Sequence, residues 1–181
     1  VIVPKAIRCC GSLNHHLGKN DEAHRDFINN INIWYEEFLE GNLDAILSNT
    51  SGCGTTIKDY GFIFKDDKKL KKRAKKISNL TKDVSEYLFE NLKLKFENKE
   101  KKMRIAYHSA CSMQHGQKVH SQPIDLLSKT KNEILEIPDG HLCCGSAGTY
   151  NILQPKIAKQ LLKDKVKNIE GLKPEIIATG N

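Results

Sequence analysis

The chain has 181 residues, of which 39% are hydrophobic, enough for one domain or for two small domains with their own cores. No apolar stretch reaches the roughly 18 residues that a membrane helix needs, and the first residues lack the basic segment and apolar run of a secretory signal. We expect a fragment cut at both ends, because the first residue is not Met and the last residues directly follow a strand-like run.

The formal net charge of +7 comes largely from lysine, concentrated in residues 65–76 and 97–104. Such runs are typical of a solvated helix face and a solvated linker. The alternative is peripheral docking on the anionic inner face of the plasma membrane or on an acidic partner subunit. We expect no nucleic-acid binding, because no aromatic side chains alternate with the lysines. Six cysteines without an export signal favour the cytoplasm, and metal or redox chemistry there.

The first predicted elements surround the sequence Cys-Cys-Gly-Ser at residues 9–12. A helical pattern extends over residues 21–39 and ends before a glycine. A strand is predicted over residues 43–49, and it leads into the glycine-flanked Cys53. The apolar face of the helix consists of Phe27, Ile31, Trp34, Tyr35 and Phe38.

The middle of the chain holds two predicted helices and a strand. Residues 65–76 are predicted to form an exposed amphipathic helix with no role in redox chemistry, and residues 83–96 a second helix. A strand over residues 103–108 runs into Cys111, and a short helical stretch follows around residues 124–127. The inward-facing residues of the lysine-rich helix are Leu70, Ala74 and Ile77.

The last predicted elements repeat the first. A strand over residues 133–137 precedes a second Cys-Cys-Gly-Ser at residues 143–146, a helix follows over residues 153–169, and a strand is predicted over residues 175–179. The helical pattern is formed by Ile157, Leu161, Leu162, Val166 and Ile169. The sequence therefore contains two copies of one unit.

Strands that alternate with helices predict an α/β fold with parallel strands. We expect two related units, each a small parallel sheet flanked by helices: residues 1–98, truncated at the start and including a linker, and residues 99–181, truncated at the end. Cys53, Cys111 and the pair Cys143 and Cys144 each lie just beyond the carboxyl end of a predicted strand, and such ends share one rim of an open α/β sheet where ligands bind. The expected neighbours are Cys9 and Cys10 with Cys53, and Cys111 with Cys143 and Cys144.

Adjacent cysteines are poorly suited to a mutual disulfide, because neighbouring Cα atoms are about 3.8 Å apart and bridged ones about 4.4–6.8 Å. Two neighbouring thiolates can instead reach different irons, and a complete unit offers about four thiolates, enough for an iron–sulfur cluster, which we expect to be of the 4Fe–4S type. Zinc sites more often use Cys-x-x-Cys, which is absent here. The predicted metal ligands are Cys9, Cys10, Cys53, Cys111, Cys143 and Cys144; no catalytic residue is predicted.

Glycines beside the cysteines are predicted to let backbone N–H groups approach the thiolates and sulfides. At Gly145 the chain should turn into a helix whose start favours deprotonated thiols. These cofactor-binding glycines are Gly11, Gly52, Gly54, Gly145 and Gly148.

Histidines are not counted as ligands. His108, His115 and His141 lie near the second group of cysteines, where surface or hydrogen-bonded imidazoles are expected. Tuning or ligation of the cluster by His141 is the alternative. His15 and His16 are placed for helix entry.

Three stretches resemble one known family: TSGCGTTIKDYG at residues 50–61, YHSACSMQHGQK at 107–118 and EIPDGHLCCGSAGTYNILQP at 136–155. They are similar to the iron–sulfur subunit of bacterial glycolate oxidase, in its carboxyl-terminal half. The Cys-Cys-Gly repeat alone is less specific, since the cysteine-rich subunit of heterodisulfide reductase and lactate-utilisation iron–sulfur proteins share it. The resemblance implies two cysteine-rich domains bearing a cluster on the six cysteines, and an upstream ferredoxin-like domain with two 4Fe–4S clusters. The chain departs from the family in lacking the first unit's leading cysteine and the second unit's last.

The resemblance also implies an electron-transfer role. Flavin-containing glycolate oxidase subunits would oxidise glycolate or a related 2-hydroxy acid, and this chain would pass the electrons toward the quinone pool. No substrate chemistry is expected on this chain alone, which shows nothing equipped for hydride abstraction or flavin binding. Two other interpretations stay open: a zinc-stabilised binding module, and a thiol–disulfide reductase that resembles heterodisulfide reductase.

Overall fold

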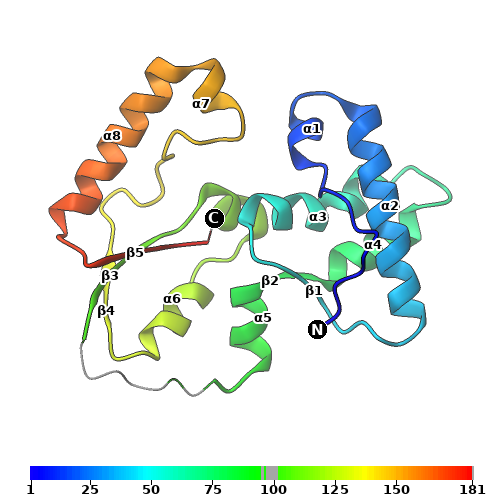
Figure 1. Ribbon diagram of the computed structural model, residues 1–181, viewed down its shortest axis with the longest axis horizontal. Coiled ribbons are helices and arrows are strands. Elements are labelled where there is room, and N and C mark those ends of the chain that lie inside the picture. The colour runs from blue at the N-terminus through cyan, green and yellow to red at the C-terminus, as the bar shows by residue number, and fades with distance from the viewer. Residues whose placement is uncertain (95, 97–101, 181) are drawn as a thin grey trace. The chain divides into compact units, whose positions relative to one another are not determined.

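A computed structural model describes residues 1–94, 96 and 102–180 (Figure 1). The chain folds into two compact units, Val1–Asp83 and Val84–Asn181. The boundary predicted between residues 98 and 99 lies outside the described residues. Each unit contains one small parallel sheet flanked by helices, which confirms the predicted α/β class.

In the first unit, helices α3 and α4 connect two strands that pair in parallel, with Ile46 opposite Thr81 and Ser48 opposite Asp83. The predicted strand over residues 43–49 is present in a shorter form. The second strand escapes prediction because its sequence, Thr-Lys-Asp, has no apolar residue. In chain order the elements are α1 (Ser12–His16), α2 (Asn20–Leu39), β1 (Ile46–Ser48), α3 (Ser51–Ile63), α4 (Lys71–Leu80) and β2 (Thr81–Asp83).

The core of the first unit gathers side chains from α2, α3 and α4. Phe27 and Ile31 are fully buried on the apolar face predicted for α2, and Trp34 packs against them at half burial. The Phe27 ring lies 4.7 Å from the ring of Tyr60 on α3, measured between centroids. The helical period of apolar residues therefore located the buried face of α2 correctly.

The lysine-rich segment becomes helical later than predicted. Residues 65–70 form turns, and α4 begins only at Lys71. In these turns the Asp67 carboxylate accepts hydrogen bonds from the backbone N–H groups of Lys69 (2.8 Å) and Leu70 (2.9 Å). Such an acceptor satisfies backbone donors just before a helix. Asp67 therefore stabilises the turn that leads into α4.

The inward face of α4 agrees with the prediction. Ala74 and Ile77 are fully buried, and Leu70 packs against the same core. Two cations of α4 lie over aromatic rings of α2: Arg73 over Tyr35 and Lys76 over Phe38, at 5.2 and 4.1 Å from the ring centroids. Two positively charged side chains of this segment thus pack on aromatic rings within the first unit.

The second unit carries a three-stranded parallel sheet in the order β4-β3-β5. All three strands lie where they were predicted, whereas the helix predicted over residues 83–96 ends earlier, at Asn91; part of its predicted end lies outside the described residues. The elements are α5 (Val84–Asn91), β3 (Arg104–His108), η1 (Ser112–Gln117), α6 (Gln122–Ser128), β4 (Glu133–Glu136), α7 (Tyr150–Leu153), α8 (Pro155–Gly171) and β5 (Ile176–Thr179).

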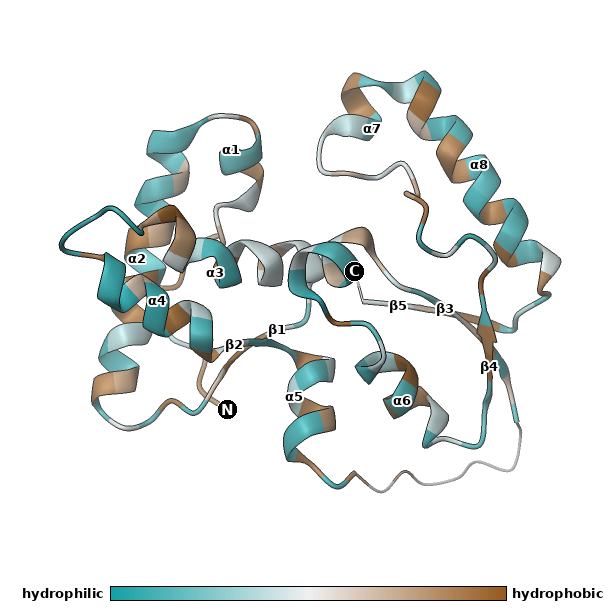
Figure 2. Ribbon diagram, turned by 180° about the vertical axis from the view of Figure 1, so that it is seen from behind, coloured by the Kyte–Doolittle hydropathy of each residue, from teal (hydrophilic) through white to brown (hydrophobic). Residues whose placement is uncertain are grey.

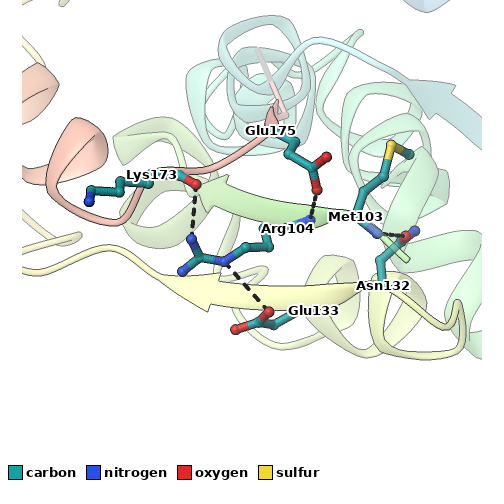
Figure 3. Close-up of polar contacts among 6 residues, drawn as sticks. All are labelled: Met103, Arg104, Asn132, Glu133, Lys173 and Glu175. Carbon is teal, nitrogen blue, oxygen red and sulfur yellow. Dashed lines mark hydrogen bonds and ion pairs between the residues drawn. The ribbon is translucent and has the colours of Figure 1, made fainter. Parts of the chain in front are cut away.

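Arg104 joins the amino ends of the three strands (Figure 3). Its guanidinium donates to the carbonyl oxygen of Lys173 at 3.0 Å and lies 3.6 Å from the carboxylate of Glu133. Its backbone N–H donates to the carboxylate of Glu175 at 3.0 Å. These contacts fix the sheet at the ends opposite to the cysteines.

Helix α8 shows a narrower buried stripe than its sequence predicts. Ile169 packs with Ala106 of β3 and with Ile137, but Ile157 and Leu162 remain 54% and 52% exposed. Brown and teal residues accordingly alternate along α8 (Figure 2). The buried positions of the helix are Ala158, Lys165 and Ile169.

Across the described residues, the helices are all too short or too polar to cross a membrane.

Candidate metal centre

The first cysteine set, defined as Cys9, Cys10 and Cys53, comes from two places in the first unit. Cys9 and Cys10 lie in the loop directly before α1, and Cys53 lies in the first turn of α3, just after β1. The sulfur atoms of Cys10 and Cys53 are 3.0 Å apart. The structure thus brings Cys10 to Cys53 across a long sequence separation, as expected, although within the described residues only Cys53 follows a strand and no strand precedes Cys10.

Burial makes Cys10 of the first set a weaker acid than an ordinary thiol. The pKa of the Cys10 thiol rises to about 12, chiefly because the side chain is removed from water, and further because it bonds to Cys53. Without a cation the Cys10 thiol is therefore held protonated at neutral pH. A bound metal would supply the positive charge that thiolates need, so the site favours metal over free thiolates.

Asn30 of α2 holds the peptide that carries the first pair of cysteines. Its side-chain oxygen accepts from the N–H of Arg8 at 2.9 Å, and its amide nitrogen donates to the carbonyl oxygens of Arg8 (3.2 Å) and Cys9 (3.0 Å). Tyr60 of α3 donates its hydroxyl to the carbonyl oxygen of Cys10 at 2.9 Å. Burial raises the pKa of Tyr60 above its usual range, so its hydroxyl remains a donor. Both residues fix the backbone and leave the sulfur atoms free to bind.

Gly11 explains why a glycine follows the first cysteine pair. Its φ of 74° lies in the left-handed region, and a Cβ there would overlap the buried ring of Phe27. Its N–H group donates to the sulfur of Cys9 at 3.5 Å. Helix α1 begins directly behind it, at Ser12.

The second cysteine set, defined as Cys111, Cys143 and Cys144, lies beyond the carboxyl ends of β3 and β4. Cys111 bonds to Cys143 and feels the charge of Cys144; together with burial, which is the largest cause, these contacts raise its pKa. The central strand β3 has neighbours on both sides, an arrangement in which ligands bind beyond the carboxyl strand ends. The three cysteines expected to meet in the second unit therefore do so.

Gly145 repeats the role of Gly11. Its φ is 88°, its N–H group donates to the sulfur of Cys143 at 3.3 Å, and a Cβ there would overlap the carbonyl oxygen of Ala158 on α8. One expectation for this turn is wrong, however. No helix starts directly behind Gly145, because Ser146 belongs to no regular element, residues 147–149 form turns and α7 begins only at Tyr150.

The other predicted glycines have separate environments. The N–H of Gly54 donates to the carbonyl oxygen of Thr50 at 2.9 Å, within the first turn of α3. Gly52 lies in the same turn with open space at its Cβ position, and Gly148 has a φ of 58° in a turn. Their role in cofactor binding stays a prediction.

The histidines of the second unit take different positions. His115 and His141 are exposed, whereas His108 is half-buried at the end of β3. Burial lowers the pKa of His108, with a second contribution from the charge of Lys165. Lys165 itself is only 5% exposed and donates to the carbonyl oxygens of Asp139 (2.9 Å) and Gly140 (3.2 Å), in the loop before the cysteine pair.

A cavity of about 430 Å³ lies in the first unit, and none of the cysteines is among its lining residues. Its walls come from α1, α2 and α3, the helices that carry or follow the cysteines. The lining residues are His15, His16, Asn20, His24, Thr55, Thr56, Asp59, Phe62 and Ile63.

The expectation that His15 and His16 lie at a helix entry is met, since both belong to α1.

The donor chemistry of both sets fits an iron–sulfur centre. Each unit gathers three free thiols, with a glycine N–H group aimed at one sulfur. Within the described part of the chain, no three His, Cys, Asp or Glu side chains converge on the position of a single metal ion. Thiolates that reach several irons of one cluster do not need that convergence.

Sequence reasoning missed Asn30, Tyr60 and Lys165. A signal for two of them exists: Asn30 interrupts the apolar face of α2 next to Phe27 and Ile31, and Lys165 lies on the stripe of Ala158 and Ile169. A polar residue on a buried stripe requires partners, and here the partners are the loops that carry the cysteines.

Comparison with known proteins agrees with this architecture. The sequence matches the cysteine-rich domain family, abbreviated CCG, over residues 1–58 and 105–181. It is 36% identical to the glycolate oxidase iron–sulfur subunit of Escherichia coli K12, over 96% of this chain and 42% of that protein. It is 27% identical to the probable glycolate oxidase iron–sulfur subunit of Bacillus subtilis 168, over 100% of this chain and 40% of that protein.

A second group of relatives consists of lactate utilization proteins. Identity to lactate utilization protein A of Bacillus subtilis 168 is 26%, over 96% of this chain and 71% of that protein. The chain therefore spans about two fifths of the length of the two glycolate oxidase subunits and most of the length of this lactate utilization protein.

Proposed function

Because the chain belongs to the cysteine-rich domain family, we propose that it is the cluster-binding part of an electron-transfer subunit of a glycolate oxidase complex. The observation that carries the proposal is the repeated site: in each unit a Cys-Cys-Gly loop meets a further cysteine beyond the end of a parallel strand. The two functional units correspond to residues 1–98 and 99–181.

Glycolate oxidase is favoured over lactate utilization by the higher identity, 36% against 26%. In the proposed complex, flavin-containing subunits oxidise glycolate to the keto acid, and this chain passes the electrons toward the quinone pool. The complex works in the cytoplasm at the inner face of the plasma membrane, where the exposed lysines of α4 face anionic lipid headgroups.

The metal ligands proposed here are the six cysteines of the two sets. A bound iron–sulfur cluster supplies one-electron redox chemistry. The residues of the chain hold the thiolates: Asn30 and Tyr60 fix the first loop, and Gly11 and Gly145 present N–H groups to sulfur. Such hydrogen bonds stabilise negative charge on the sulfur and raise the reduction potential of a cluster.

The proposal is tested by iron and sulfide counting and by EPR on the anaerobically purified full-length protein. The Cys10→Ser and Cys144→Ser variants should each lose or change one cluster signal, and Ser146→Ala serves as a matched control in the same loop. Reduction of the flavin by glycolate should survive in the assembled complex, while electron transfer to a quinone analogue should fall.

Two results would contradict the proposal. A colourless, EPR-silent protein with stoichiometric zinc would identify a zinc-stabilised binding module. A full iron complement with unchanged spectra in Cys144→Ser, together with activity on disulfide substrates, would favour a thiol–disulfide reductase.

A further inference from the structure

The two units hold the loop before their cysteine pair with residues in equivalent positions. Gly11 packs against the helix backbone at Ala23, and Gly145 packs against the helix backbone at Ala158. Asn30 and Lys165 each follow that alanine by seven residues, which is two turns along the helix. The repeat thus places Asn30 of α2 and Lys165 of α8 in the same position relative to the Cys-Cys-Gly turn.

Both side chains form hydrogen bonds to the backbone of a cysteine loop. Asn30 is 0% exposed and binds the N–H and carbonyl groups of Arg8 and the carbonyl of Cys9. Lys165 is 5% exposed and binds the carbonyl oxygens of Asp139 and Gly140. In each unit one buried polar residue therefore ties the helix after the cysteine pair to the loop before it.

The two residues differ in charge. The amide of Asn30 is neutral, whereas the side chain of Lys165 ends in an ammonium group and is only 5% exposed. Among the residues that the structure describes, Lys165 forms hydrogen bonds to carbonyl oxygens but no ion pair with a carboxylate. A buried cation is unfavourable unless negative charge lies nearby.

The second cysteine set is a source of such negative charge. Asp139 and Gly140 lie shortly before Cys143, and the Lys165 charge also acts on His108 at the end of β3, which is followed by Cys111. The charge of the Lys165 ammonium group therefore acts on both loops that contribute thiols to the second set. Asn30 brings no charge to the first set.

We propose that Lys165 is a positioning residue that also gives the second cysteine set a fixed positive charge, which the first set lacks. The inference rests on the proposed binding of iron–sulfur clusters. A fixed positive charge stabilises the reduced, more negative form of a thiolate-bound cluster. The second centre is consequently easier to reduce than it would be with a neutral residue at this position.

The test uses the full-length protein with Lys165→Gln, which keeps a hydrogen-bond donor without charge, and Lys165→Met, which keeps neither. Lys163→Gln is the matched control, an exposed lysine on the same helix. In EPR redox titrations, the signal that Cys144→Ser removes should move to a more negative potential in both Lys165 variants. A change of about tenfold in the reduction equilibrium corresponds to about 59 mV for one electron. Lys163→Gln should leave it unchanged.

A second measurement separates positioning from charge. In the metal-free full-length protein, alkylation of Cys143 and Cys144 by iodoacetamide, mapped by mass spectrometry, should accelerate in Lys165→Met and much less in Lys165→Gln. Cys9 and Cys10 should react at the wild-type rate in both.

The outcomes are distinct. An unchanged potential in both variants overturns the electrostatic part of the proposal, and unchanged alkylation rates overturn the positioning part. If the wild-type protein binds no cluster, the proposed function fails, while the alkylation rates still decide whether Lys165 positions the loop.

Discussion

The two cysteine sets share their backbone geometry but differ in how the chain surrounds them. In both units a glycine with positive φ donates its N–H group to the first sulfur of the pair and packs tightly against a later helix, α2 in the first unit and α8 in the second. The first set, however, has a helix starting directly behind Gly11 and the neutral Asn30 beneath its loop. The second has turns behind Gly145 and the charged Lys165.

This difference shows which properties the repeat fixes and which it leaves free. The N–H group that is directed at the first sulfur of each pair depends on a left-handed glycine turn, which is present in both units. The electrostatic surroundings depend on a single side chain on the helix. Two sites with the same glycine turn can therefore acquire different redox properties through one substitution.

The largest expected effect follows from adding a Cβ at the glycine of each pair. Gly145→Ala combines a left-handed backbone with overlap against the main chain of Ala158, which cannot move without shifting α8. We expect a loss of about 3–5 kcal/mol in the free energy of unfolding. Gly11→Ala should cost somewhat less, since its clash is with the Phe27 side chain. Urea denaturation of the metal-free protein measures both.

Gly41→Ala is the matched control for this comparison. Gly41 also has a positive φ, 76°, but nothing lies within 4 Å of its Cβ position. Gly41→Ala should lower the free energy of unfolding by about 1–2 kcal/mol, which is the cost of the backbone conformation alone. Equal losses at all three glycines would show that helix packing does not constrain the cysteine loops.

A smaller effect is expected from Asn30→Ala, which leaves the backbone groups of Arg8 and Cys9 without their partner in the first unit. Buried groups that lose their hydrogen bonds cost about 1–3 kcal/mol. Asn42→Ala is the control, because the exposed side chain of Asn42 donates to the carboxylate of Glu40 at the surface, and its loss should cost less than about 1 kcal/mol. Faster alkylation of Cys9 and Cys10 in Asn30→Ala alone would connect the lost stability to the cysteine loop.

The sequence was sufficient to predict the strands of the second unit and the meeting of the cysteines, because apolar runs and cysteines beyond their ends are local patterns. It was insufficient for β2, whose residues Thr81 and Asp83 are buried although polar. It also misplaced the start of the lysine-rich helix, since the preceding residues form turns in which Asp67 binds backbone N–H groups. Such features depend on single hydrogen bonds, which produce no repeating pattern in the sequence.

The positioning residues were not predicted from the sequence, for a related reason. Asn30 and Lys165 look like interruptions of apolar stripes, and their partners are backbone groups more than twenty residues earlier. Helical periodicity predicts that such positions are buried but does not predict what they bind. Only the folded loop shows that both reach the peptide before the cysteines.

A third prediction concerns the acid side of stability in the second unit. Burial and the Lys165 charge lower the pKa of His108, so below the ordinary value near 6.5 the unfolded chain takes up a proton that the folded chain does not. Stability should therefore be complete above that value and fall as the pH drops toward the lowered pKa. In His108→Gln the urea midpoint should change less between pH 7 and pH 5. An unchanged slope would mean that another group titrates in this range.

The smallest expected effect belongs to the first unit, where Asp67 caps the turn that leads into α4. Hydrogen bonds from the backbone N–H groups of Leu70 and Lys69 lower the pKa of this exposed carboxyl group. The stabilisation is thus present above the ordinary Asp value, near 3.9, and is lost as the pH falls through the lowered pKa. Asp67→Ala should lower the urea midpoint slightly at neutral pH, whereas Asp67→Asn should keep most of the cap and lose only its acid dependence. If Asp67→Asn retained the wild-type acid dependence, the capping carboxylate would not be its source, and the lower stability of the first unit in acid would have to arise from another carboxyl group.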